Sequence, residues 1–365
     1  MELPIDMVYH LSFHQETSMN LSAFKVTFDG ILEQYVGQKI HQAKTLLDNQ
    51  KLNTYIDYIN TFIFSGGKRI RPYCLWIAYR WFGGKDEQAI LNFGIMFELL
   101  HTMALIHDDI IDQSKKRHNI PTIHHYISSM LNQSDYHIAE WQAILIGDLL
   151  LSWVYELRYK DHNFSETLLY NARQNVHTMI EEVILGQIID VDMMTGEPAT
   201  LDMIEKKNMY KTACYTFIRP MLTWAILAWA SEENKKLIEE LGKYLWLAFQ
   251  VRDDLFDITF GDTTKSIFSD IQEWQQTFFT NYIFDKGTEE EKNLLKNCMR
   301  KKLTESEINE LQNVFITSGA IAFGKELIEK YAQQAEDILE KIHFDNEESK
   351  LDIQMLITQI SHLKM

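Results

Sequence analysis

The sequence predicts an all-α protein, a bundle of ten or more helices around a central cavity. Apolar residues recur at intervals of three and four along most of the 365 residues, whereas alternating strand patterns are confined to short runs. Helix breakers are scarce, with 15 Gly and 5 Pro. Hydrophobic residues make up 46% of the chain, which is enough for a large core. Since no linker or low-complexity segment divides it, we expect one domain over residues 1–365.

The expected helices follow a loosely patterned N-terminal lead-in, residues 1–24. Ser65-Gly66-Gly67 interrupts the first periodic region, and Pro72 suits the first turn of the helix after it. The expected helical segments, in chain order, are 24–64, 73–82, 87 to the first acidic cluster, 138–160, 164–186, 201–230, 233–260, 289–300 and 304–342.

Two acidic clusters share the pattern Asp-Asp-x-x-Asp, and both follow apolar helices that are typical of burial. Residues four apart lie on one helix face, so Asp108 projects with Asp112, and Asp253 projects with Asp257. Facing each other, they would form a carboxylate cage for Mg²⁺ carrying a polyphosphate. The middle aspartates, Asp109 and Asp254, point about 100° away and are expected either to pair with cations or to support the metal ligands from behind. A charged helix end is the alternative for either cluster alone.

Basic residues gather at a glycine turn, residues 66–72, that leads into a helix. Backbone N–H groups and the helix dipole favour an anion there, and Lys68 and Arg71 add positive charge. A second basic group, residues 115–117, follows the first acidic cluster, and Lys211-Thr212 supplies another cation. Each basic group has solvated surface charge as its alternative.

Together, and in this order, the motifs resemble those of the trans-isoprenyl diphosphate synthases (polyprenyl synthetases). The resemblance covers about residues 60–275 and implies an isoprenoid-synthase-type bundle. The matching motifs are residues 66–72, Asp108 to Asp112, residues 147–150, Gly186-Gln187 with Asp190, residues 211–213, residues 249–254 with Asp257, and Lys265.

The resemblance implies a Mg²⁺-dependent prenyltransferase. It would condense isopentenyl diphosphate head-to-tail with an allylic prenyl diphosphate to give a longer polyprenyl diphosphate. The implied metal ligands are Asp108, Asp112, Asp253 and Asp257. The implied allylic diphosphate ligands are Arg117, Lys211, Gln250 and Lys265, with Thr212 nearby. The implied isopentenyl diphosphate ligands are Lys68, Arg71, His101 and His118.

Product length should depend on Met103 and Ala104, which lie one turn before Asp108 on the same helix. In the family, a bulky aromatic residue there stops chain growth early. Neither residue is aromatic, so neither would block the end of the cavity that holds the growing hydrocarbon tail. This predicts a product of about twenty carbons or more. The alternative is that Met103, or Leu100 one turn further from Asp108, closes the space into which the product tail would extend.

Two departures from the family pattern remove positive charge. Arg117 is followed by His118-Asn119 where the family has a second arginine and a glycine, and Gln275 stands where the family has a lysine. The competing interpretations are a terpene synthase or cyclase, a partner-dependent catalytic subunit, and a peptide-modifying prenyltransferase.

Composition narrows the remaining function classes. A net charge of −17 argues against nucleic-acid binding. The three cysteines are far apart and are expected to be reduced thiols. The apolar stretch 221–230 is about half the length of a membrane span, and residues 1–6 do not resemble a signal peptide. We therefore expect a cytoplasmic protein without a stable membrane span, as a homodimer, with a heteromer as the alternative.

Overall fold

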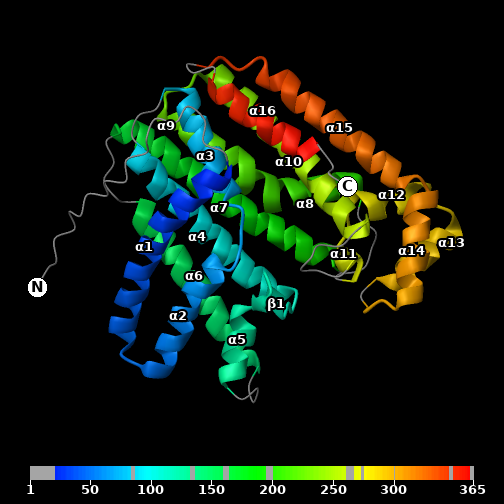
Figure 1. The fold of residues 1–365 in the computed structure, drawn as a ribbon, viewed down its shortest axis with the longest axis horizontal. Coiled ribbons are helices and arrows are strands. Elements are labelled where there is room, and N and C mark those ends of the chain that lie inside the picture. Colours follow the sequence, from blue (N-terminus) through cyan, green and yellow to red (C-terminus); the bar gives the residue numbers. More distant parts are fainter. Residues whose placement is uncertain are drawn as a thin grey trace, which may run out of the picture.

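The computed structural model describes residues 21–83, 87–131, 136–158, 164–194, 200–259, 267–272, 275–299, 301–344 and 348–361. More than ten helices form in these ranges, so the prediction of an all-α bundle is confirmed (Figure 1). The first half contains α1 (Leu21–Leu47), α2 (Gln50–Phe64), α3 (Ile70–Trp81), α4 (Glu87–Ile111), α5 (Ile123–Met130), α6 (Tyr136–Arg158) and α7 (Glu166–Met193). The second half contains α8 (Leu201–Asn208), the π-helix η1 (Met209–Ile218), α9 (Arg219–Leu227), α10 (Glu232–Thr259), α11 (Ser269–Gln272), α12 (Phe278–Lys286), α13 (Glu289–Cys298), α14 (Glu305–Thr317), α15 (Ala320–Leu339) and α16 (Glu348–Ser361).

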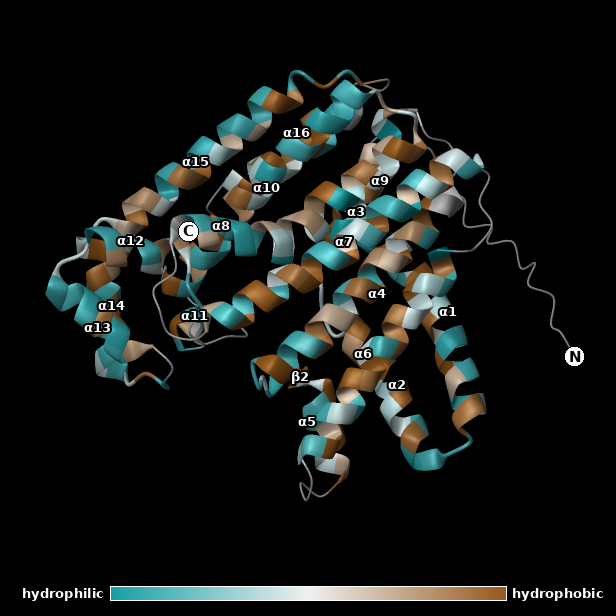
Figure 2. Cartoon of the chain, turned by 180° about the vertical axis from the view of Figure 1, so that it is seen from behind, coloured by the Kyte–Doolittle hydropathy of each residue, from teal (hydrophilic) through white to brown (hydrophobic). Residues whose placement is uncertain are grey.

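The helices α4, α7, η1 and α10 lie in the middle of the bundle and carry the acidic and basic motifs (Figure 1). α4 packs along α6, α7 packs along η1, and α10 packs along both η1 and α15. The buried apolar side chains form one large core that runs from α1 to α16, with a small separate cluster at Met193 and Ile204. Hydrophobic segments recur along the inner helices, whereas α13 and α14 are mostly hydrophilic (Figure 2). A continuous core of this kind is what a single-domain chain requires.

A short β-hairpin follows α4. β1 (Lys116–Arg117) pairs antiparallel with β2 (Ile120–Pro121), with Arg117 opposite Ile120. The two turn residues, His118 and Asn119, both have positive φ, at 47° and 66°. This is the backbone geometry that a two-residue hairpin turn needs, and asparagine adopts it readily. The hairpin holds Arg117 close to the end of α4.

Several predicted boundaries are wrong. α1 begins at Leu21 and buries Phe24, so this helix includes the last residues of the predicted lead-in. The predicted segment 304–342 is divided at Gly319, whose φ of 89° ends α14 and reorients the chain into α15. α5, α12 and α16 were not predicted, because they are short or follow segments of mixed character.

Two helices in the described part of the chain are long and apolar enough to cross a membrane, which corrects the expectation that no apolar stretch reaches that length. They are Ile90–Ile111 in α4 and Tyr136–Arg158, which is α6. The α4 window is 72% buried inside the bundle, as expected for a core helix, whereas the α6 window is only 39% buried. One face of α6 therefore presents apolar side chains at the surface.

Candidate active site

A polar cavity of about 170 Å³ lies between the C-terminal ends of the two helices that carry the acidic clusters. α4 contributes Asp108 to its wall, the turn after α4 contributes Asp112, and α10 contributes Gln250 and Asp254. The predicted residues Lys211 and Thr212 line it from η1. The remaining lining residues are Lys207, Asn208, Asp270, Gln275, Gln276 and Thr277. The structure thus brings the two acidic motifs and the lysine motif to one hollow.

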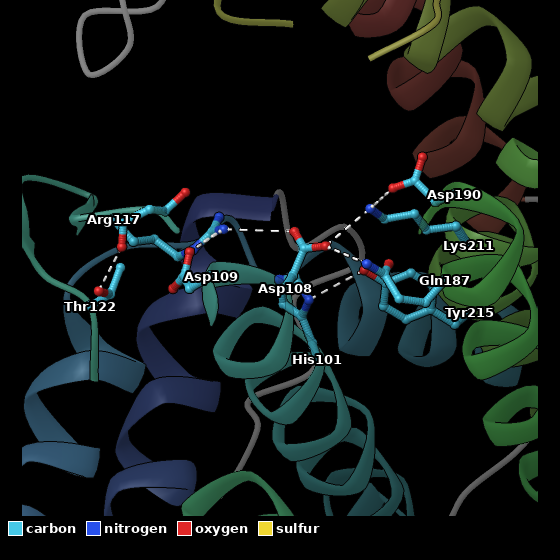
Figure 3. A network of polar contacts seen from close by, with 10 residues as sticks. His101, Asp108, Asp109, Arg117, Thr122, Gln187, Asp190, Lys211 and Tyr215 are labelled. Carbon is cyan, nitrogen blue, oxygen red and sulfur yellow. Dashed lines mark hydrogen bonds and ion pairs between the residues drawn. The ribbon is translucent and has the colours of Figure 1, made fainter. Parts of the chain in front are cut away.

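Asp108 is the centre of the polar network around this cavity (Figure 3). Lys211 Nζ donates a hydrogen bond to Asp108 Oδ1 at 3.0 Å, and Gln187 Nε2 donates to the same oxygen at 3.1 Å. On the other side, Arg117 Nη2 lies 4.0 Å from Asp108 Oδ2. Cations therefore flank Asp108 on both sides, in an arrangement that would also hold an anionic ligand.

Lys211 is held in place by two carboxylates and by close backbone packing. Its Nζ donates to Asp190 Oδ2 at 2.6 Å in addition to Asp108. Burial disfavours the charged ammonium, but attraction to Asp108 and then to Asp190 outweighs this and raises the pKa of Lys211. A Cβ at Gly186 would lie 2.2 Å from the backbone N of Lys211, so α7 and η1 can approach this closely only at a glycine. The π-helix occurs where the lysine motif meets α7, and such helices often mark functional sites.

Asp190 is buried and binds two lysines. Its Oδ1 lies 3.2 Å from Lys207 Nζ, and its Oδ2 accepts the bond from Lys211. Burial alone would raise the pKa of Asp190, but attraction to Lys207 and then to Lys211 outweighs it and holds the pKa below its ordinary value of 3.8. One carboxylate thus fixes two ammonium groups at the wall of the polar cavity.

The second acidic cluster is oriented differently from the prediction. Asp254 lines the polar cavity, whereas Asp253 is exposed, and neither Asp253 nor Asp257 is among the residues that line it. Asp257 instead accepts a hydrogen bond from the backbone N of Asp270 at 3.3 Å. The reason is the rotation of α10, since neighbouring residues on a helix diverge by about 100° and tertiary packing decides which one faces the hollow.

Asp254 is deeply buried, and Gln250 Nε2 donates to its Oδ1 at 2.6 Å. Burial, followed by repulsion from Asp270, raises the pKa of Asp254 well above its ordinary value. Its second oxygen, Oδ2, is buried without a hydrogen-bond partner in the described structure. A buried oxygen of this kind at a cavity wall favours a proton or a cation as its partner.

Arg117 makes a bidentate pair with Asp109, the middle aspartate of the first cluster. Its Nη2 donates to Asp109 Oδ1 at 2.7 Å, and its Nε donates to Asp109 Oδ2 at 3.1 Å. Asp109 is 1% exposed, so this pair is fixed rather than solvated. The geometry matches the cation-pairing role expected for Asp109.

Two of the predicted isopentenyl diphosphate residues, Arg71 and His118, lie near His101. The guanidinium of Arg71 lies 4.1 Å from the ring centroid of Tyr215, and Tyr215 Oη lies 3.4 Å from His101 Nδ1. Burial, followed by the positive charges of Arg71 and Arg117, holds the pKa of His101 well below its ordinary value, so its ring is neutral at neutral pH. A group of cations around a neutral histidine is an electrostatic site for an anion.

The basic turn contacts the hairpin at this place. A Cβ at Gly66 would lie 2.5 Å from the ring of His118, so the turn lies directly against that ring. Buried Arg69 anchors the turn, since its Nη1 donates to Glu98 at 2.9 Å and its Nε donates to Asp29 at 2.6 Å. Lys68 is exposed beside it.

A second, mainly apolar cavity of about 380 Å³ adjoins the polar one and shares Asp108 and Lys211 with it. Met103 and Ala104, the residues expected to set product length, both line it. Its other lining residues are Leu105, His107, Ile111, Val183, Ile184, Gln187, Ile188, Val191 and Tyr215. Its size is within the range of about 300–1,000 Å³ that is usual for small-molecule sites.

The donor set fits Mg²⁺ bound together with a diphosphate. Among the residues that the structure describes, no three carboxylate, histidine or cysteine side chains lie close enough to hold a metal ion by themselves. Mg²⁺ in phosphate-binding sites usually takes one or two carboxylates and completes its octahedron with substrate oxygens and water. Asp108 and Asp112, with Asp254 and Asp270 on the same wall, can provide such oxygens.

Sequence reasoning missed Lys207, Tyr215 and Asp270. Lys207 had a usable signal, since it lies four residues before Lys211. Tyr215 and Asp270 had none, because their positions depend on how η1 and α11 pack. The predicted Lys265 lies outside the described residues, as do Glu273 and Trp274 beside Gln275.

Known proteins are similar to this chain in both sequence and fold. The family model of polyprenyl synthetases matches residues 49–315. The chain is 27% identical over 305 residues to a geranylfarnesyl diphosphate synthase from Aeropyrum pernix, an overlap of 82% of this chain and 91% of that protein. It is 30% identical over 286 residues to a geranylgeranyl diphosphate synthase from Sulfolobus acidocaldarius, covering 76% and 81% of the two chains.

The solved structure of geranylgeranyl pyrophosphate synthase from Corynebacterium glutamicum, complexed with isoprenyl diphosphate and magnesium, has a similar fold. The TM-score is 0.83 at 24% identity, over 92% of this chain and 98% of that one. The chain therefore belongs to the polyprenyl synthetase family of trans-isoprenyl diphosphate synthases, and it is a prenyltransferase.

Proposed function

We propose that the protein elongates an allylic prenyl diphosphate by head-to-tail condensation with isopentenyl diphosphate. One observation carries this proposal: a polar and an apolar cavity meet at Asp108 and Lys211. An allylic diphosphate has the same division into a charged head and a hydrocarbon tail, so its scissile C–O bond would lie at this junction. The activities named for the two relatives above support the same reaction.

The allylic diphosphate would bind to Lys211 and Arg117, with Thr212 and Gln250 beside it. Both cations are already fixed by aspartates, so little side-chain ordering is needed when the substrate arrives. Asp108 and Asp112 would bind Mg²⁺ together with Asp254, and Asp253, Asp257 and Lys265 remain predicted ligands. When bound, Mg²⁺ would neutralise the charge that develops on the leaving diphosphate.

Isopentenyl diphosphate would bind at Lys68, Arg71, His101 and His118. His101 lies seven residues before Asp108, which places the two anion sites about 10 Å apart along α4. The double bond of this substrate attacks the allylic carbon, a new C–C bond forms, and diphosphate leaves with the electron pair of the C–O bond. The tertiary cation that forms on the isopentenyl unit then loses a proton from the carbon next to it to the released diphosphate, and a new double bond results. The mainly apolar walls around Tyr215 would offer few hydrogen-bond partners to water, which could otherwise capture the allylic cation.

Met103 and Ala104 would control product length from the floor of the apolar cavity. Met103 is buried and Ala104 is half-buried, and both face the space into which the tail extends. With no aromatic side chain at either position, we propose a product of about twenty carbons or more, because the pocket length limits the tail that fits.

The protein would act as a homodimer. On α6, Trp141 and Leu145 are 62% and 64% exposed. Exposed apolar side chains grouped on a helix face mark interaction surfaces. A second copy covering this face would remove it from water, with a heteromeric partner as the alternative. The expected cytoplasmic location stays a prediction.

An assay with farnesyl diphosphate, Mg²⁺ and labelled isopentenyl diphosphate tests the proposed reaction. We expect label in a longer prenyl diphosphate only when both substrates are present. A cyclic hydrocarbon formed from farnesyl diphosphate alone would instead identify a terpene cyclase.

A further inference from the structure

Lys207, at the end of α8, is a buried lysine to which neither the sequence motifs nor the proposed reaction assigns a role. It is 6% exposed, and lysine is almost never buried to this degree unless it is paired. It lines the polar cavity together with Asp108, Lys211 and Asp254. Its ammonium group is therefore part of the wall that would face a diphosphate.

The three acceptors around Lys207 Nζ differ in distance. Asp190 Oδ1 lies at 3.2 Å, whereas Gln275 Oε1 and the backbone O of Gln276 lie at 3.4 and 3.5 Å. Hydrogen bonds from nitrogen usually measure about 2.7–3.2 Å, so the last two contacts are long. An ionised phosphate oxygen is a stronger acceptor than an amide oxygen, and it would replace either contact favourably.

The two lysines supply the positive charge of this cavity. Lys207 and Lys211 line it together with Asp108, Asp112, Asp254 and Asp270, and both lysines share the buried carboxylate of Asp190. Mg²⁺ bound with a diphosphate would neutralise the lining carboxylates, which leaves the two ammonium groups to pair with phosphate oxygens. The result is a pair of cations, four residues apart, that could grip one diphosphate at two points.

The contact with Gln275 shows where a second cation could be placed. Lys207 Nζ lies 3.4 Å from Gln275 Oε1, so a lysine at position 275 would bring its ammonium group to the same part of the cavity wall. We propose that Lys207 is a diphosphate-binding residue of the polar cavity. This inference rests on the proposed function.

A charge swap tests the proposal. Binding of inorganic diphosphate in the presence of Mg²⁺ is measured by calorimetry for the wild type, Lys207→Gln, Gln275→Lys and the double variant. Lys206→Gln is the matched control, because Lys206 is exposed on the same helix. We expect Lys207→Gln to weaken diphosphate binding about tenfold, as for loss of one charge-assisted hydrogen bond. The double variant should recover to within about threefold of the wild type.

The KM for the allylic substrate should rise in Lys207→Gln and recover in the double variant, whereas Lys206→Gln should match the wild type. Thermal unfolding is recorded for each variant, and titrations are run below the unfolding range of the least stable one. A purely structural lysine would lower the unfolding temperature and leave diphosphate affinity unchanged. That result, or a double variant no better than Lys207→Gln, would overturn the proposal.

The elongation reaction and the role of Lys207 can be refuted independently of each other. If the wild type bound diphosphate through Lys207 but made no longer product, the elongation reaction would be wrong and the role of Lys207 would stand. If the wild type elongated substrate while Lys207→Gln bound diphosphate normally, only the role of Lys207 would be lost.

Discussion

Asp190→Asn should destabilise the protein more than any neighbouring charge removal on α7. Asp190 is 2% exposed and pairs with Lys207 at 3.2 Å and Lys211 at 2.6 Å. The variant leaves two buried ammonium groups without their shared carboxylate, and breaking a buried pair in this way costs about 3 kcal/mol or more. An unfolding entropy of about 2.1 cal/mol/K per residue gives roughly 0.8 kcal/mol/K for a chain of this length, so Tm should fall by about 4 °C.

Circular dichroism during heating at pH 7 measures this effect. Asp192→Asn is the control, since Asp192 is exposed on the same helix and loses the same charge. Its Tm should stay close to that of the wild type. Equal Tm values for the two variants would refute the view that Asp190 holds the lysine pair.

The same pair predicts a pH dependence. The pKa of Asp190 is held below its ordinary value of 3.8 in the folded protein. A carboxyl group with a lowered folded pKa contributes stability above its unfolded pKa, and that stability is lost as the pH falls through the folded pKa. Wild-type Tm should therefore fall more steeply than that of Asp190→Asn below about pH 4.

Three further variants test the substrate sites and the assembly. Ala104→Phe should shorten the product seen on chromatography, because the aromatic ring would fill the floor of the apolar cavity. An unchanged product length would contradict the proposal that Met103 and Ala104 set that length. Tyr215→Phe keeps the ring under Arg71 but removes the contact with His101, so the KM for isopentenyl diphosphate should rise about three- to tenfold. An equal rise for the allylic substrate would argue against that assignment. Leu145→Glu should convert the proposed dimer to monomers in sedimentation experiments, while Lys206→Gln should not. A Leu145→Glu variant that sediments as the wild type would contradict an interface on this face of α6.

Much of the fold could be predicted from the sequence because helical periodicity is a local signal. The long helices α4, α7 and α10 follow directly from their apolar spacing, and the glycine turn before α3 lies where it was expected. The break at Gly319 was harder, since one glycine inside a periodic region does not by itself require a positive φ. The π-helix η1 depends on its packing against α7 and has no local pattern of its own.

The candidate site could also be predicted only in part from the sequence. The spacing of the aspartates predicted that Asp108 and Asp112 project together, and the family resemblance implied that Lys211 and Gln250 join them; the structure has all four at one cavity. Spacing could not tell whether Asp253 or Asp254 faces that cavity, since the rotation of α10 is set by tertiary contacts. It also overlooked Lys207, whose partners Asp190 and Gln275 are distant in sequence.

The most direct test of a reaction site where the two cavities meet is a turnover assay with labelled isopentenyl diphosphate. The wild type and Asp108→Asn are compared, each with Mg²⁺ or with excess chelator. Asp108 lines both cavities and bonds to Lys211, so its loss should lower kcat by at least about a hundredfold, as for removal of one transition-state charge contact. The chelator should abolish turnover by the wild type. Chain elongation that persisted in Asp108→Asn, or without a divalent metal, would contradict the proposed site.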